Sequence, residues 1–211
     1  MQTFRKHTGV VVPLEKVNVD TDQIIPKQFL KRIERTGFGK FLFYDWRFAG
    51  DENARTKATG DFVLDEQRYA KASILVAGKN FGCGSSREHA VWALADFGFR
   101  VVIASSFADI FANNSLKNGL LTVCLSEEQV TEIMRHAKAL ANYALTVDLE
   151  KLRVEDGQGF AATFTMDEFS RHCLLHGLDD IGLTLEHEAQ IAAYEAHHPV
   201  RAEMKAIATI L

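Results

Sequence analysis

A glycine-rich turn between an apolar run and a helical run constrains this chain more than any other feature. Residues Ile74–Ala77 are apolar enough for a buried strand, and Ala90–Ala95 has the spacing of one helix face. The segment between them, residues 78–89, reads Gly-Lys-Asn-Phe-Gly-Cys-Gly-Ser-Ser-Arg-Glu-His. Its three glycines permit a sharp turn. The segment therefore predicts a strand–turn–helix unit with polar side chains at the start of the helix.

Strand-like and helix-like runs alternate along the first two thirds of the chain. The expected strands are at residues 9–13, 73–77, 100–104 and 120–124. The expected helices are at residues 86–97, 107–117 and 126–141, the last opened by the capping sequence Ser126-Glu-Glu-Gln. Such alternation is typical of an α/β domain with a largely parallel sheet.

The later part of the chain changes character. Short strands are expected over residues 144–149, 151–155 and 160–164, and helices over about 167–176 and 185–197. We expect one α/β domain over residues 1–184, with a mixed sheet and a second β layer, and a C-terminal helical extension over residues 185–211 that serves as an interaction arm.

An aromatic segment precedes the glycine-rich turn. Residues 29–48 predict a mobile loop followed by a short helix. Two interpretations of residues 38–48 stay open: a surface that a partner covers, or ordinary core.

Composition narrows the classes of protein. The 211 residues are 47% hydrophobic, which is ample for a core, and the net charge of −4 comes without a basic run, so nucleic-acid binding has little support. No apolar run is long enough for a bilayer, and residues 1–7 lack the apolar part of a signal peptide. The three cysteines lie far apart in the sequence, which argues against a disulfide framework. We expect a cytoplasmic protein with no membrane partner.

Ser85, Ser86 and Arg87 indicate an anion site. Free N–H groups and the helix dipole attract negative charge at a helix N-terminus, and a guanidinium matches a carboxylate. A capping box, in which Ser85 accepts from the Glu88 N–H, is the simpler alternative. It does not explain Arg87, because a cation is unfavourable there unless an anion binds. We predict a pocket for a small carboxylate or phosphate beside a reactive hydroxyl.

Two further segments carry chemistry-bearing side chains. Asn18-Val-Asp-Thr-Asp22 starts like a calcium loop but lacks its glycine and its glutamate. A turn held by aspartate side chains and a carboxylate that orients a catalytic group both remain possible for this segment. Cys83 is interpreted as a packing residue, although a helix N-terminus nearby would lower the pKa of its thiol.

The segment Asn80–Ala90 resembles the signature of the swivelling domain of the aconitase superfamily. Residues 17–26 and 106–119 resemble two further blocks of that family. Residues 28–37 narrow the resemblance to the small-subunit family of bacterial 3-isopropylmalate dehydratases. The resemblance covers nearly the whole chain and implies a three-layer β/β/α fold.

The activity that the resemblance implies is a hydro-lyase reaction of leucine biosynthesis. It interconverts 2-isopropylmalate and 3-isopropylmalate through the alkene isopropylmaleate. Small subunits of citramalate (methylmalate) and homoaconitate dehydratases are closely related, so those substrates remain alternatives. A non-catalytic carboxylate-binding module is the alternative from a different class.

The resemblance also implies roles for individual residues. Ser85 would be the base that removes a proton from carbon, Arg87 would bind a substrate carboxylate, and Asp22 would lie near the active site. Ser86 and Gly84 would contact the substrate.

The segment 28–37 is the expected determinant of substrate choice. Phe29, Leu30 and Ile33 offer an apolar wall for the isopropyl group, whereas Arg32 or Arg35 would bind an anion instead. Packing of the loop onto the core explains the same residues equally well.

The family uses a [4Fe–4S] cluster held by three cysteines, two of them in a Cys-x-x-Cys pair. Here Cys83, Cys124 and Cys173 include no such pair. The resemblance therefore implies that the cluster belongs to a large partner subunit, that this chain binds no metal, and that the two chains act as a heterodimer.

Overall fold

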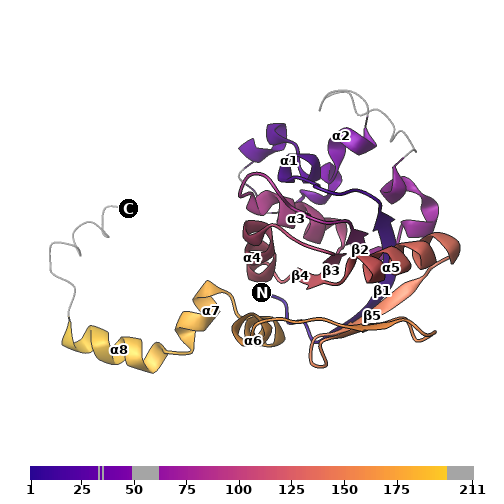
Figure 1. Ribbon diagram of the computed structural model, residues 1–211. Coiled ribbons are helices and arrows are strands. Elements are labelled where there is room, and N and C mark those ends of the chain that lie inside the picture. The colour runs from indigo at the N-terminus through magenta and orange to yellow at the C-terminus, as the bar shows by residue number, and fades with distance from the viewer. Residues whose placement is uncertain (33, 35, 49–61, 199–211) are drawn as a thin grey trace. The chain divides into compact units, whose positions relative to one another are not determined.

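The structure is a computed structural model that describes residues 1–32, 34, 36–48 and 62–198 (Figure 1). The chain divides into two compact units, Met1–Gly177 and Leu178–Leu211. The second unit contains α7 (Asp180–Leu185) and α8 (Glu188–His197). The division thus falls before α7, whereas the sequence suggested a boundary at the end of that helix.

A seven-stranded mixed sheet forms the centre of the first unit. Its strand order is β4-β3-β2-β1-β5-β6-β7. The parallel strands are β1 (Lys6–Leu14), β2 (Ala72–Ala77), β3 (Val101–Ala104) and β4 (Leu121–Cys124).

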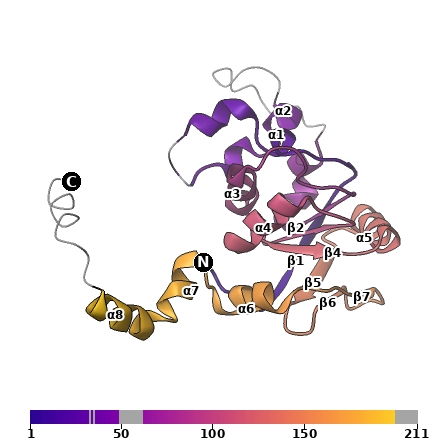
Figure 2. The same ribbon diagram turned by 60° about the vertical axis from the view of Figure 1, so that its left-hand side comes forward.

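The antiparallel strands are β5 (Ala144–Asp148), β6 (Arg153–Glu155) and β7 (Ala161–Thr163), which lie together at the lower side of the first unit in Figure 2. β5 pairs with β1, so the meander continues the same hydrogen-bonded sheet. The predicted mixed sheet is confirmed, and the predicted second β layer is the curled continuation of the first.

Helices cover both faces of the parallel strands (Figure 1). Alternate residues of a strand point to opposite faces. Leu75 accordingly shares a core with Leu94 of α3 (Glu88–Phe97) and Phe111 of α4 (Asp109–Lys117). Ile74 shares the other core with Ile133 of α5 (Glu127–Ala139). α6 (Glu168–His176) adds Leu174 to that second core.

Capping explains where α5 begins. The Ser126 side chain accepts a hydrogen bond from the Gln129 N–H, and the Gln129 side chain accepts one from the Ser126 N–H. This reciprocal cap confirms the start that the sequence predicted.

The aromatic segment is ordinary core. Phe29, Phe38 and Phe43 are fully buried, and the rings of Phe29 and Phe41 stack with centroids 4.0 Å apart. The segment forms short 3₁₀ helices at Lys27–Lys31 and Gly39–Phe41, followed by α2 (Tyr44–Arg47). The predicted short helix is therefore confirmed. Of the two interpretations of residues 38–48, a surface awaiting a partner is wrong for Phe38, Phe41 and Phe43, because the chain buries them itself.

The remaining short elements are α1 (Thr21–Ile24) and 3₁₀ helices at Val63–Asp65 and Gln67–Tyr69. Among the helices that the structure describes, none has both the length and the apolarity needed to cross a membrane.

Candidate active site at the ends of the parallel strands

The loops that follow β1 and β2 are joined by backbone hydrogen bonds beyond the ends of the strands. The N–H of Asn18 donates to Lys79 O at 2.9 Å, and the N–H of Gly82 donates to Val19 O at 2.7 Å. Asp20 and the residue opposite it in the second loop, Cys83, form an isolated parallel bridge. The two loops thus extend the β1–β2 pairing at the carboxyl edge of the sheet, where open α/β sheets usually bind ligands.

The loop after β3 joins the same assembly. The N–H of Phe81 donates to Ser106 O at 3.1 Å, and the N–H of Asn80 donates to the Ser106 hydroxyl at 2.8 Å. The Asn80 side chain donates to Oδ1 of Asn18 at 2.9 Å. Both asparagines have left-handed backbones, with φ of 58° and 52°, a conformation that asparagine tolerates.

The glycines of the turn are needed for two different reasons. Gly82 has φ +77°, and a Cβ there would lie 2.2 Å from Cγ of Phe111. Gly84 has φ +93° but ordinary space around it. Close packing therefore requires the first glycine, and backbone direction favours the second.

Ser85, Ser86 and Gly84 are exposed at the end of this turn. α3 begins at Glu88, two residues later than predicted, with Arg87 as its N-cap and no side chain capping it. The alternative of a capping box at Ser85 is therefore wrong, because Ser85 lies two residues before the N-cap, Arg87. Within the described residues its hydroxyl has no hydrogen-bond partner, and the first N–H groups of α3 lack a side-chain acceptor.

Arg87 forms an ion pair with Asp22, its Nη1 donating to Oδ1. The Arg87 side chain is 16% exposed and that of Asp22 is 51% exposed. This corrects the expectation that only a bound anion makes an arginine acceptable at this helix end, since Asp22 balances its charge. A guanidinium has several N–H donors. One of them is used by Asp22, so others remain for a further acceptor.

The two aspartates of the Asn18–Asp22 segment have different tasks. The Asp20 side chain accepts from the Gln23 N–H at 2.7 Å, and the Gln23 side chain accepts from the Asp20 N–H at 3.0 Å. Asp20 thus caps α1, while Asp22 faces Arg87. The sequence pattern Asp-x-x-Gln signals this capping box, but our reading of the sequence missed it.

A buried threonine between them was missed as well. Thr21 is 2% exposed, and its hydroxyl donates to the backbone carbonyl of Ser85 at 2.9 Å. No local sequence signal indicates this contact, because it joins residues 64 positions apart.

Cys83 and His89 flank the candidate site. Burial, and after it the negative charge of Asp20, raises the pKa of the Cys83 thiol. This favours the packing role expected for Cys83 over an activated thiolate. Burial lowers the pKa of His89, whose ring lies 5.2 Å from that of Phe38 and 4.7 Å from that of Trp92.

The residues expected to determine substrate specificity differ in burial in the structure. Phe29 is fully buried, so the expectation that it lines the substrate pocket is wrong; the ring belongs to the core. Leu30 is half-buried against the same core, and Arg32 is exposed with its guanidinium 4.7 Å from the Phe41 ring centroid. Ile33 and Arg35 lie outside the described residues.

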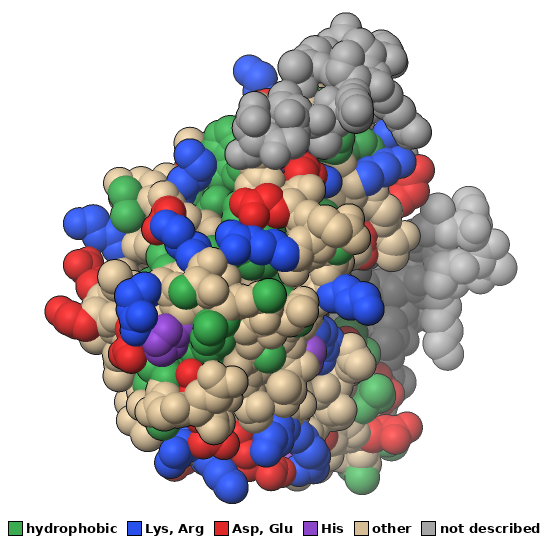
Figure 3. Space-filling view, turned by 90° about the vertical axis from the view of Figure 1, so that its right-hand side faces the viewer, with side chains coloured by type: hydrophobic (Ala, Val, Ile, Leu, Met, Phe, Trp, Pro, Cys, Tyr) green, Lys and Arg blue, Asp and Glu red, His purple; other side chains and the backbone are tan. Residues whose placement is uncertain are grey.

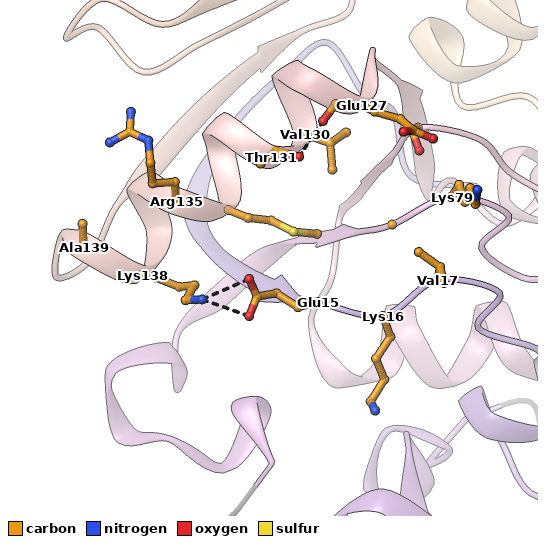
Figure 4. Close-up of a pocket in the computed structure, with 13 residues that line it drawn as sticks. Glu15, Lys16, Val17, Lys79, Glu127, Val130, Thr131, Arg135, Lys138 and Ala139 are labelled. Atoms are coloured by element: carbon orange, nitrogen blue, oxygen red, sulfur yellow. Dashed lines mark hydrogen bonds and ion pairs between the residues drawn. The ribbon is translucent and has the colours of Figure 1, made fainter.

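A pocket of about 740 Å³ lies on the same edge of the sheet but on its α5 side (Figure 4). Lys16, Lys79 and Arg135 contribute charge to its wall, and Lys138 forms an ion pair with Glu15 across it at 2.9 Å. Neither Ser85 nor Arg87 lines this pocket. It is therefore separate from the candidate active site.

Within the described residues, no cluster of possible metal ligands is found. No group of three histidine, cysteine, aspartate or glutamate side chains there could hold a metal ion. All three cysteines are free: Cys83 half-buried, Cys124 exposed and Cys173 buried. The three thiols thus differ in exposure and belong to the turn before α3, to β4 and to α6.

Charge on the surface is mixed. Figure 3 shows lysine and arginine side chains beside aspartate and glutamate side chains across one face of the molecule. That face does not resemble the basic stripe typical of a nucleic-acid interface.

Comparisons with known proteins cover both units of the chain. The family model for the aconitase C-terminal domain matches residues 1–128, and a model named LeuD_N matches residues 131–168. The model for the C-terminal domain of the 3-isopropylmalate dehydratase small subunit matches residues 180–202.

Curated relatives match along nearly their full length. A 3-isopropylmalate dehydratase small subunit from Brevibacillus brevis is 58% identical over 196 residues, which are 93% of this chain and 99% of the relative. A 3-isopropylmalate dehydratase small subunit from Koribacter versatilis is 60% identical over 198 residues, which are 94% of this chain and 100% of the relative.

A solved structure supports the fold. The crystal structure of a 3-isopropylmalate dehydratase from Methanocaldococcus jannaschii matches with a TM-score of 0.64 at 23% identity. The match covers 90% of this chain and 99% of that one. It confirms the architecture of the sheet and helices, as expected for the aconitase-type swivelling domain.

Proposed function

Because this chain belongs to the family of 3-isopropylmalate dehydratase small subunits, we propose that it interconverts 2-isopropylmalate and 3-isopropylmalate together with a large subunit. The reaction is a dehydration to isopropylmaleate followed by rehydration, and it belongs to leucine biosynthesis. The observation that carries a catalytic role for this chain is the exposed Ser85 hydroxyl beside Arg87, at the start of an uncapped helix.

Ser85 is our candidate for the base. Dehydration removes a proton from the carbon next to a carboxylate, and the electron pair of that C–H bond forms the alkene as hydroxide leaves the neighbouring carbon. A serine alkoxide can accept the proton only where its negative charge is stabilised. In this proposal the N–H groups at the start of α3, which lack a side-chain acceptor, and the Arg87 donors that Asp22 does not use would supply such a field. Rehydration returns the proton from the Ser85 hydroxyl to carbon.

Arg87 is our candidate for the group that holds a substrate carboxylate. Its planar guanidinium can form two parallel hydrogen bonds with a carboxylate. Asp22 fixes one side of that guanidinium and so orients the remaining donors. Ser86 and Gly84, exposed on the same turn, would complete the polar contacts with the dicarboxylate.

In this proposal the large subunit activates the hydroxyl group that leaves the substrate. The family's [4Fe–4S] cluster needs three cysteine ligands, and the described residues of this chain offer no cluster of ligands for it. We therefore assign the cluster, with the activation of that hydroxyl, to the large subunit. The isolated chain should be inactive for that reason.

Substrate choice and the C-terminal segment complete the proposal. Leu30 and Arg32 remain candidates for contact with the substrate side chain, since neither is fully buried.

Residues 185–211 are proposed as a helical extension for interaction, and residues 1–184 as the swivelling domain. The free cysteines fit the reducing cytoplasm, which we propose as the location.

Reconstitution of the two subunits tests this function. Ser85→Ala should lower kcat by about 10³-fold, within the usual range for loss of a catalytic base, while substrate binding to the assembled pair is largely kept. Ser170→Ala, a change of the same kind in α6, should leave kcat unchanged. Unchanged turnover of the Ser85→Ala pair would leave only a carboxylate-binding role for this chain.

A substrate screen tests the specificity. The wild-type pair should prefer isopropylmalate over citramalate and homoaconitate, measured as kcat/KM. A preference for either of the other acids would contradict the proposed substrate while leaving the dehydratase chemistry intact.

A further inference from the structure

Thr21 contacts the glycine-rich turn, which carries Ser85, at two points. Its hydroxyl donates to Ser85 O at 2.9 Å, and its backbone N–H donates to Cys83 O at 2.8 Å. These two carbonyls lie on either side of Gly84, the residue of the turn with the greatest backbone freedom. Thr21 therefore restrains the turn across its most flexible position.

Burial makes this contact specific. Thr21 is 2% exposed and, with Ser115, is one of two polar residues that are buried within the described part of the chain. The hydrogen bond itself is part-buried, and within the described residues Thr21 is the group that donates to the Ser85 carbonyl.

The restraint has a direct consequence for the candidate base. A peptide unit is planar, so fixing the Ser85 carbonyl fixes the plane that also contains the Cα of Ser85. The direction of the Ser85 side chain then depends on ψ and χ1 of Ser85, and the second hydrogen bond, to the Cys83 carbonyl, limits the backbone part of that freedom. In the same trans unit, the N–H of Ser86 points away from Thr21, and within the described residues no hydrogen bond uses it.

We propose that Thr21 is a positioning residue for this reaction, whose buried hydroxyl holds the Ser85 peptide so that the Ser85 hydroxyl faces the substrate. The inference rests on the proposed function, because Thr21 acts only through Ser85. Thr21 itself does not touch the substrate in this proposal.

Three variants in the reconstituted pair test the role. Thr21→Val removes the hydroxyl and keeps the shape, Thr21→Ser keeps the hydroxyl, and Ser115→Ala is the matched control. Ser115 is also fully buried, and its hydroxyl also donates to a backbone carbonyl, that of Phe111 at 2.8 Å. That carbonyl belongs to α4 and not to the glycine-rich turn.

The expected result is a loss in kcat that follows the hydroxyl. Thr21→Val should lower kcat by at least about tenfold, because small displacements of a reacting group reduce rates steeply, and should change KM by less than about threefold. Thr21→Ser should restore most of kcat, and Ser115→Ala should leave kcat near that of the wild type. Thermal unfolding and association with the large subunit are measured for every variant.

Two outcomes would overturn the proposal. One is wild-type kcat in Thr21→Val while Ser85→Ala is inactive; the other is equal loss in Thr21→Val and Ser115→Ala, which indicates general destabilisation. Full activity of the Ser85→Ala pair would instead refute the proposed base. Because that variant is measured separately from the Thr21 variants, the two failures can be told apart. If Thr21→Val does not fold, Thr21→Ala removes the same hydroxyl without a new methyl group.

Discussion

Arg87 donates a hydrogen bond to Asp22, a residue 65 positions earlier in the chain. The pair joins the loop after β2 to α1, which follows β1, at the carboxyl edge of the sheet. It explains how an arginine is tolerated at the start of α3, where the helix dipole is positive. It also gives the guanidinium a fixed direction, which the proposed binding of a substrate carboxylate needs.

Replacement of Asp22 by asparagine tests that relationship. Asp22→Asn removes the charge that holds Arg87, so kcat in the reconstituted pair should fall by about tenfold or more as the guanidinium loses its direction. KM should stay the same or fall, because the uncompensated cation still attracts the dicarboxylate. Steady-state kinetics measure both constants. Asp45→Asn, at an exposed aspartate in α2, is the control; equal kcat in both variants would contradict the orienting role.

Gly82 provides a prediction about stability. Gly82→Ala should lower the free energy of unfolding by about 2–4 kcal/mol, because it adds left-handed backbone strain to a clash with Phe111. Gly157→Ala is the matched control, since Gly157 has φ +72° and open space around it. There the loss should be only about 1 kcal/mol, from backbone strain alone. Urea unfolding compares the two, and equal losses would show that Phe111 yields without cost.

Phe29 should affect folding and not substrate choice. Phe29→Ala removes a fully buried ring that stacks on Phe41, and should lower the free energy of unfolding by about 3–5 kcal/mol. Arg32→Ala, at an exposed neighbour, should change it by no more than about 0.5 kcal/mol. Thermal and urea unfolding measure the difference. A Phe29→Ala protein with wild-type stability and an altered preference between isopropylmalate and citramalate would return Phe29 to the substrate pocket.

His7 should make stability depend on pH. Burial, and after it the charge of Arg100, lowers the pKa of His7 below its ordinary value of 6.5. Above pH 6.5 the imidazole is neutral in both states, so its contribution to stability is fully present. As the pH falls below that value, the unfolded chain binds a proton that the folded chain still refuses, and the free energy of unfolding decreases down to the folded-state pKa.

A variant that cannot titrate isolates this effect. His7→Gln keeps a polar group for Ser73, whose hydroxyl lies 2.8 Å from Nε2 of His7. Urea unfolding at about pH 7.5 and about pH 5.5 should show a smaller decrease for His7→Gln than for the wild type, because a free histidine is mostly neutral at the first pH and mostly protonated at the second. The same decrease in both proteins would exclude His7 as the source.

The order of strands and helices could be predicted from the sequence because it depends on local patterns. The apolar run Ile74–Ala77, the spacing of Ala90–Ala95 and the cap at Ser126 each act over a few residues. Periodicity and capping therefore located these elements to within one or two residues at most ends. The glycine-rich turn was likewise readable, since left-handed backbone at Gly82 and Gly84 follows from residue type.

The contacts that form the candidate site could not be predicted in this way. The pairing of Asp22 with Arg87, the burial of Phe29 and the hydrogen bond from Thr21 to Ser85 all join distant segments or depend on packing.

The amino-acid sequence alone determined the local elements, the special turn and the chemical character of its side chains. The tertiary structure decided which of those side chains meet. The physical reason is that the parallel register of β1 against β2 sets how their following loops align, and only that alignment brings Thr21 to the carbonyl of Ser85.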